Sequence, residues 1–150
     1  MKPTIEKPKV FISYAWGSQE YQNKVLSFAR DLVGVGIDVL LDKWDLKEGN
    51  DTYAYMEKCV NDKTVTNVIV LLDPNYEEKA NNRTGGVGTE TQIISPEIYN
   101  KVNQEKFLPV IFQKKQDGSI PKPHFLKGIL HFDLSDEKVY YKEYQILVKR

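Results

Sequence analysis

The chain has 150 residues, of which 41% are hydrophobic and 28% charged, a composition typical of one globular domain with its own core. Lysine plus arginine and aspartate plus glutamate number 21 each, and this balance argues against a nucleic-acid binder, which would carry a basic excess. The sequence contains no signal-peptide pattern and no apolar window long enough to span a membrane, so we expect a cytoplasmic protein without a membrane partner.

The first third of the chain is predicted to form a strand, a helix and a second strand. Residues 9–16 are β-branched and aromatic, as in a buried strand, and Ser18 can cap the helix that follows. Gly34 and Gly36 end that helix, and residues 37–42 form the second predicted strand. Helical spacing places five apolar side chains on one face of the helix: Tyr21, Val25, Phe28, Ala29 and Leu32.

The middle of the chain contains the most apolar segment. A polar loop over residues 43–51 precedes a short helix, on whose apolar face the single cysteine, Cys59, is expected to pack. Residues 65–73 are almost continuously apolar, which is typical of a central parallel strand covered on both faces. Pro74 ends this strand, and we expect a long polar loop over residues 74–88.

The last third is predicted to contain two more strands, at residues 106–112 and 129–134. A helical stretch ends near residue 102, before the first of them, and Ser135 begins a helix after the second. Strands that alternate with helices indicate a parallel sheet with right-handed crossovers and helices on both faces. We therefore predict an α/β fold with a five-stranded parallel sheet in the order 2-1-3-4-5.

This strand order predicts where a ligand would bind. In such sheets ligands bind beyond the carboxyl ends of the first and third strands, where the strand order reverses. Three segments are expected to converge on that crevice: residues 14–17, 42–51 and 73–90.

The third segment ends in the glycine-rich stretch "GGVGTE". A phosphate-binding Walker loop needs a lysine and a hydroxyl residue directly after its last glycine, whereas Thr89 and Glu90 stand there, so we reject that interpretation. Thr89 and Gln92 match a capping box, and Glu90 would then lie in the first turn, where the helix dipole favours a carboxylate. Alternatively Ser95 caps a later helix with Pro96 at its first position. An acidic residue in a first helical turn is also common without any function.

Other kinds of chemistry find little support in the sequence. His124 and His131 have no cluster of cysteines or carboxylates at ligand spacing, so we expect no metal site. No nucleophile elbow or Ser/His/Asp arrangement is present. Trp16 and Trp44 are either core or rim aromatics or contacts for a ligand.

Taken together, the motifs resemble the Toll/interleukin-1 receptor (TIR) superfamily, and its bacterial, SEFIR-like branch in particular. "VFISYAW" is similar to its first box, "GIDVLLDKWDLKEGND" to its second strand and BB loop, and "VIVLLDPNY" to its third strand. "NRTGGVGTETQIISPEIY" resembles the segment that enters its third helix. The resemblance implies a flavodoxin-like fold, with residues 9–150 as a TIR domain behind a tail of residues 1–8. No glycine or proline follows the last apolar turn in "YQILVKR", so we expect a domain excised from, or continuing into, a further module.

The resemblance implies two alternative functions. Many bacterial relatives hydrolyse NAD⁺ or cyclise its ADP-ribose part, whereas many animal members are non-catalytic signalling adaptors. The catalytic residue of the enzymes is a glutamate in the third helix region, and Glu90 occupies that position, although Gly86 stands where enzymatic relatives often have tryptophan. We therefore expect an NAD⁺ glycohydrolase that acts in antiphage defence when it oligomerises, with NAD⁺ as substrate and no cofactor. A related domain that processes another nucleotide is a third possibility.

The resemblance also implies which residues bind the substrate. Tyr14, Ala15 and Trp16 end the first strand, and the rings of Tyr14 and Trp16 are expected to stack on nicotinamide or adenine. In the BB loop, Asp42 to Asp51, self-association with other TIR domains is expected to complete the site. The BB-loop residues expected to contact the substrate or a neighbouring copy are Asp42, Trp44 and Asp45.

Overall fold

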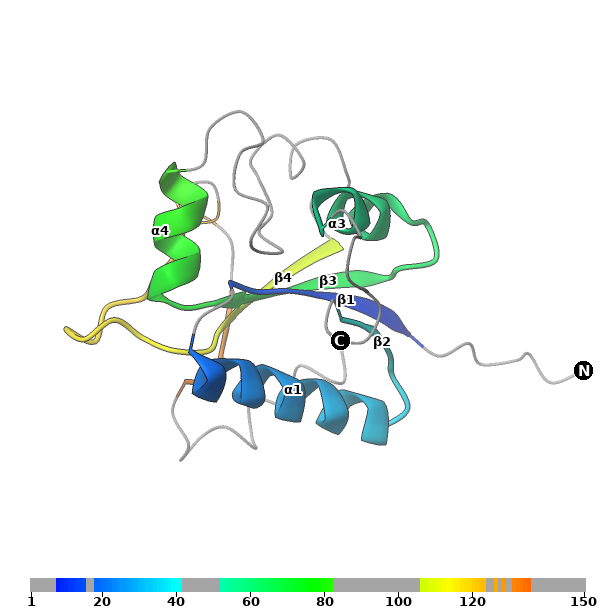
Figure 1. Ribbon diagram of the computed structural model, residues 1–150, viewed down its shortest axis with the longest axis horizontal. Coiled ribbons are helices and arrows are strands. Elements are labelled where there is room, and N and C mark those ends of the chain that lie inside the picture. Colours follow the sequence, from blue (N-terminus) through cyan, green and yellow to red (C-terminus); the bar gives the residue numbers. More distant parts are fainter. Residues whose placement is uncertain are drawn as a thin grey trace, which may run out of the picture.

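A computed structural model describes residues 8–15, 18–41, 52–82, 106–123, 126, 128 and 131–135. In chain order its elements are β1 (Lys9–Ser13), α1 (Gln19–Gly34), β2 (Asp38–Leu40), α3 (Thr52–Asn61), β3 (Asn67–Leu72), α4 (Pro74–Asn82), β4 (Phe107–Ile111) and β5 (Phe132–Asp133). The five strands form one parallel sheet in the order β2-β1-β3-β4-β5 (Figure 1). This confirms the predicted order 2-1-3-4-5.

The central strands are buried because helices cover both faces of the sheet. α1 lies on one face, and α3 and α4 lie on the other (Figure 1). Successive side chains of a strand point to opposite faces, so Val10 and Ile12 pack on the α1 side while Phe11 packs on the α3 and α4 side. The almost continuous apolar run of β3 divides in the same way, with Ile69 and Leu71 on the α1 side.

The first helix matches its prediction. The Ser18 side chain caps α1 by accepting a hydrogen bond from the backbone N–H of Tyr21 at 3.1 Å. The chain leaves the helix through Gly36, whose φ of 94° is a conformation that glycine adopts without strain. The five apolar residues expected on one face are all buried: Tyr21, Val25, Phe28, Ala29 and Leu32.

The helices on the other face complete the second half of the core. In α3, Cys59 and Val60 are buried against β1 and β3, which confirms that the cysteine side chain packs in the core. Tyr76 of α4 is fully buried in the same cluster. No helix in the described ranges has the length and apolarity that crossing a bilayer requires.

One predicted loop is wrong in its first half. The expected loop over residues 74–88 begins with the helix α4, Pro74–Asn82. Asp73 caps this helix and Pro74 stands at its first position, where the missing N–H of proline costs no hydrogen bond. Proline therefore ends the strand, as expected, and at the same time begins a helix.

The strands are shorter than predicted. Their hydrogen-bonded parts are Lys9–Ser13, Asp38–Leu40, Asn67–Leu72, Phe107–Ile111 and Phe132–Asp133. The apolar runs extend beyond them because residues such as Leu41, Val65 and Leu134 remain buried just outside the ladder. The alternative helix starts at Thr89 and Ser95 lie outside the described residues, as does the helix expected after Ser135.

Candidate functional site

The candidate site lies at the carboxyl ends of β1 and β3, which are neighbours in the sheet. Their register pairs Ser13 at the end of β1 with Val70, so Tyr14 and Ala15 lie beside the last residues of β3. Asp73 follows β3 directly and begins α4. This arrangement is the topological switch point at which parallel sheets bind ligands.

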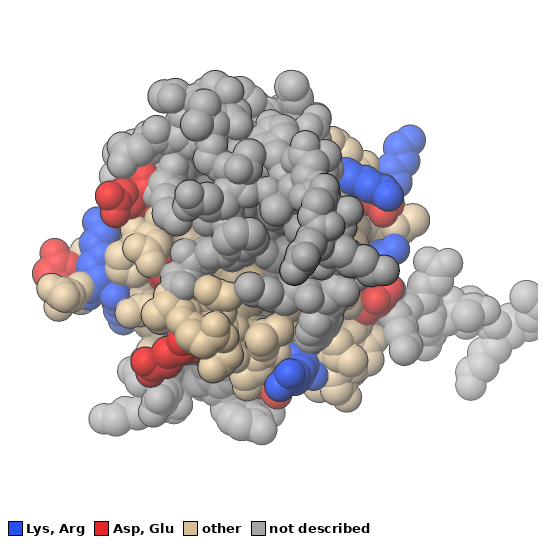
Figure 2. Space-filling view, in the orientation of Figure 1, with Lys and Arg blue, Asp and Glu red and all other residues tan. Residues whose placement is uncertain are grey.

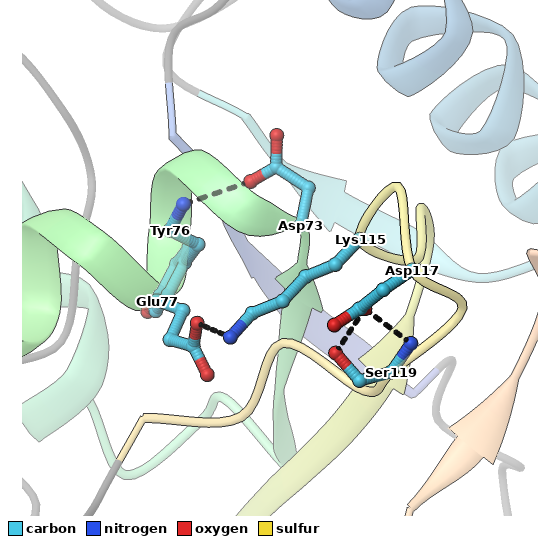
Figure 3. A network of polar contacts seen from close by, with 6 residues as sticks. All are labelled: Asp73, Tyr76, Glu77, Lys115, Asp117 and Ser119. Atoms are coloured by element: carbon cyan, nitrogen blue, oxygen red, sulfur yellow. Dashed lines mark hydrogen bonds and ion pairs between the residues drawn. The ribbon is translucent and has the colours of Figure 1, made fainter.

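Asp73 is a buried acidic residue, with 2% of its surface exposed. Its carboxylate accepts a hydrogen bond from the backbone N–H of Tyr76 at 2.9 Å (Figure 3). A carboxylate at a helix start is stabilised by the unpaired amides of the first turn and by the helix dipole. Asp73 therefore gives the end of β3 a fixed acceptor that lies inside the protein.

A second buried polar contact joins β1 to α4. The hydroxyl oxygens of Ser13 and Tyr76 lie 2.8 Å apart, and both residues have no exposed surface. Buried hydroxyl groups are costly unless they are paired, so this hydrogen bond fixes the end of β1 against the first turn of α4. Ser13, Asp73 and Tyr76 form the buried polar cluster of the site.

An open hollow of about 600 Å³ lies next to this cluster. One wall is the start of α4, and the other is the segment that follows β4. The hollow thus lies beside the ends of β3 and β4, one strand away from the predicted crevice between β1 and β3. The residues that line it are mostly polar: Asp73, Pro74, Asn75, Gln113, Lys114, Lys115, Gln116 and Asp117.

An ion pair connects the two walls of the hollow. Nζ of Lys115 lies 2.5 Å from Oε1 of Glu77 on α4 (Figure 3). The hydrogen bond to Glu77 raises the pKa of Lys115 above its usual value. On the same segment, hydrogen bonds from the side chain and backbone of Ser119 lower the pKa of Asp117. Both signs of charge are therefore held in place at the rim.

The charged groups of the described residues do not favour an anion or a metal ion in particular. On the face shown in Figure 2, the coloured acidic and basic side chains are interspersed. Within the described ranges, no three histidine, cysteine or carboxylate side chains are grouped as metal ligands would be.

The structure describes two of the predicted site residues. Tyr14 has 1% of its surface exposed and belongs to the core on the α1 side, while Ala15 is fully buried on the α3 and α4 side. The stacking role of Tyr14 stays a prediction. The remaining predicted site residues lie outside the described residues: Trp16, Asp42, Trp44, Asp45 and Glu90.

Sequence reasoning placed Asp73 in the convergent segments but missed its partner Tyr76. The signal was present in "LLDPNY", because an aspartate followed by proline after a strand is a helix start. Once α4 begins at Pro74, Tyr76 lies in its first turn and its side chain reaches Ser13. The pairing with Ser13 itself, 63 positions away, has no local signal.

Comparisons with known families and solved structures found similar proteins with the same fold. The family model of the SEFIR domain matches residues 8–140. A crystal structure of a prokaryotic SEFIR domain is 39% identical and superimposes with a TM-score of 0.83, over 95% of this chain and 91% of that one. The TIR domains of the activated Roq1 resistosome, which directly recognises the pathogen effector XopQ, are 17% identical with a TM-score of 0.50, over 95% and 81% of the two chains, and share the fold. A comparison with curated proteins gave no match.

Proposed function

This chain belongs to the SEFIR domain family, and we propose that it is an NAD⁺ glycohydrolase that self-association activates. It would cleave the N-glycosidic bond between nicotinamide and ribose, and release ADP-ribose or a cyclic isomer. Glu90 is the proposed catalytic residue. Its proposed role is bacterial antiphage defence, in which a partner module clusters the domain and NAD⁺ is depleted.

The chemistry explains why a single carboxylate is sufficient. Ordinary glycosidases need a second carboxylic acid to protonate the leaving group. In NAD⁺ the nicotinamide is a cationic pyridinium that leaves as a neutral base, so no acid is required. Positive charge then builds up on the ribose, and water adds its oxygen to C1′ while a proton is released. A preorganised anion beside that carbon stabilises the transition state by about 3–4 kcal/mol, as comparable fixed groups do.

One observation carries the proposal: buried polar groups gather at the switch point of the sheet. Ser13, Asp73 and Tyr76 join the ends of β1 and β3 to the first turn of α4. In parallel α/β sheets, ligands bind outside the carboxyl ends of the strands at such a switch point. Glu90 lies outside the described residues, and its assignment rests on its place in the sequence motif.

The proposed substrate contacts divide into two groups. Tyr14 and Ala15 are buried, so in this proposal they form the wall beneath the substrate. Trp16, Asp42, Trp44 and Asp45 are proposed to contact the substrate or a neighbouring copy. The BB loop would mediate self-association, and the activity of the isolated domain would therefore be low at low concentration.

A charge-neutralising variant of Glu90 tests the proposal. Protein clustered on a multivalent scaffold is incubated with etheno-NAD, whose fluorescence rises on cleavage. Glu90→Gln should lower the rate about 100- to 1000-fold, the usual cost of one preorganised group at a transition state. Glu78→Gln makes the same chemical change at an exposed position of α4 and should leave the rate unchanged. Equal rates for Glu90→Gln and the wild type would contradict the assignment.

The second candidate function is a non-catalytic interaction module. Membership of the SEFIR family favours it, since SEFIR domains are typically interaction modules. Such a module would self-associate through the BB loop but leave NAD⁺ intact even when it is clustered. Product analysis by chromatography at high protein concentration separates the two candidates, and a panel of other nucleotides in the same assay tests for a different substrate.

A further inference from the structure

Tyr21 carries a buried polar group that the mechanism above does not use. The residue is 7% exposed, and its hydroxyl has no hydrogen-bond partner within the part of the chain that the structure describes. An unpaired buried hydroxyl destabilises a protein, and such groups are rare in native structures. A phenylalanine would fill the same space without that cost, so the hydroxyl requires a physical explanation.

Packing places the Tyr21 ring beside Phe112, whose backbone is bonded to the segment that leads into the polar cluster of the site. The Tyr21 ring packs edge-on against Phe112, with ring centroids 6.0 Å apart and an interplanar angle of 79°. The backbone N–H of Phe112 donates to the carbonyl of Leu72 at 2.9 Å, and Leu72 directly precedes Asp73. Ile69 and Leu71 face α1, so one further step of the alternation brings Asp73 to the same side as Tyr21.

Electrostatics agrees with this placement. Burial, and next the negative charge of Asp73, raise the pKa of Tyr21 well above its usual value of 10.0. Tyr76 and Tyr14 act on the hydroxyl in the same direction. The phenol is therefore protonated throughout the physiological range and is available as a donor to an acceptor other than the described residues.

We propose that a hydroxyl group from outside the chain bridges the phenol of Tyr21 and the carboxylate of Asp73. The bridging group accepts from Tyr21 and donates to Asp73, which a water molecule or a sugar hydroxyl can do and an anion or an apolar group cannot. A buried water needs two to four polar partners, and Tyr14 and Tyr76 add two more hydroxyls to this region. The bridge would tie α1 to the start of α4 across the end of β3.

The two sources of the hydroxyl have different consequences. A water molecule would be part of the folded protein with or without ligand. A sugar hydroxyl would come from the ribose of the substrate, and this source rests on the proposed function. In that case the unpaired phenol is a cost that the free protein carries and that substrate binding removes, which makes Tyr21 a residue that selects for ribose.

Tyr21→Phe tests the proposal through the melting temperature of the 150-residue protein, measured with and without ADP-ribose. The substitution keeps the ring on Phe112 and removes only the hydroxyl. If water forms the bridge, Tm falls by about 2–4 °C without ligand, the shift that one lost hydrogen bond causes in a protein of this size. If the sugar forms it, Tm without ligand stays the same or rises, and the rise in Tm that ADP-ribose causes in the wild type is at least halved.

Two further variants calibrate these results. Tyr76→Phe removes a hydroxyl with a known partner, Ser13, and gives the loss in Tm for a bonded phenol. Asp73→Asn keeps a capping side chain but replaces the carboxylate, and its effect should be less than additive with Tyr21→Phe if both residues hold the same group. An unchanged or raised Tm for Tyr21→Phe, together with an unaltered response to ADP-ribose, overturns the proposal.

Failure of the proposed function has a separate signature. If clustered wild-type protein leaves etheno-NAD intact, the enzymatic proposal fails. The ligand-free Tm of Tyr21→Phe still decides whether water forms the bridge, because that measurement does not depend on turnover.

Discussion

The two ends of the parallel sheet are built differently. At the amino end, Nζ of Lys106 donates to the carbonyls of Val60 and Asp62 at 2.7 and 2.9 Å, and so pairs one carbonyl in the last turn of α3 and one just after the helix. Thr66 bonds the carbonyl of Lys9 through its backbone and its side chain, which fastens β3 to β1. These contacts satisfy backbone groups where elements begin or end.

At the carboxyl end the polar groups are side chains, and they are buried. Ser13, Asp73 and Tyr76 have between 0% and 2% of their surface exposed, and the buried phenol of Tyr21 has no hydrogen-bond partner among the described residues. Polar groups in such places cost folding free energy unless they are fully paired. The amino end of the sheet is therefore built for stability. The carboxyl end contains buried polar side chains that cost stability, and a function is to be expected there.

The largest effect on stability is expected from the amino end. Lys106→Met removes both hydrogen bonds of the ammonium group and leaves two carbonyls of the α3 end without their donor. The free energy of unfolding, measured with urea, should fall by about 2–3 kcal/mol, as for hydrogen bonds to a charged group. NAD⁺ cleavage per folded molecule should stay unchanged.

Lys58→Met is the matched control for that change. Lys58 lies exposed in the last turn of α3, and its loss should alter stability by less than about 0.5 kcal/mol. If Lys106→Met lowers turnover per folded molecule, the division of roles between the two ends is wrong.

An intermediate effect is expected at the carboxyl end. Ser13→Ala removes the hydrogen bond between the hydroxyls of Ser13 and Tyr76 and should lower the free energy of unfolding by about 1–2 kcal/mol. Turnover of clustered protein should fall by more than the loss of folded protein explains, because the end of β1 is no longer fixed to α4. Ser27→Ala, at an exposed position of α1, should change neither quantity. Unaltered turnover per folded Ser13→Ala molecule would contradict a site at this end.

The smallest effect on stability is expected at Asp133, the last residue of β5, and it depends on pH. Burial alone would raise the pKa of Asp133, but hydrogen bonds from Ser135 and Lys114 outweigh it and hold the pKa below the usual 3.8. Since the folded pKa is lowered, this stabilisation is complete well above pH 3.8 and disappears as pH falls through the lower folded value.

Ser135→Ala should therefore lower the free energy of unfolding by about 0.5–1 kcal/mol at pH 7. The difference from the wild type should shrink below pH 3.8, the ordinary value for an aspartate. Urea unfolding of both proteins between pH 7 and pH 3 measures this, and a difference that stays constant over the range would show that Asp133 does not carry the effect.

Local sequence signals were reliable where one segment forms its own contacts. Ser18 and the apolar spacing of α1 predicted a helix that the structure confirms, and the apolar run of β3 predicted a central strand. Pro74 was misread because proline fits both the end of a strand and the first turn of a helix. Its neighbour Asp73, as a capping residue, decides between these two outcomes.

The sequence by itself determined the alternation of strands and helices, because hydrophobic periodicity and capping act between residues close in the chain. The usual order of strands in such sheets then led to the strand order and to the region of the switch point. Only the tertiary structure decided that Ser13 meets Tyr76 and that the ring of Tyr21 packs against Phe112. The tertiary structure also shows that the open hollow lies beside the ends of β3 and β4, and not between β1 and β3 as predicted. Contacts of this kind depend on how the helices rest on the sheet, and no local pattern encodes the distance between side chains that sixty residues of chain separate.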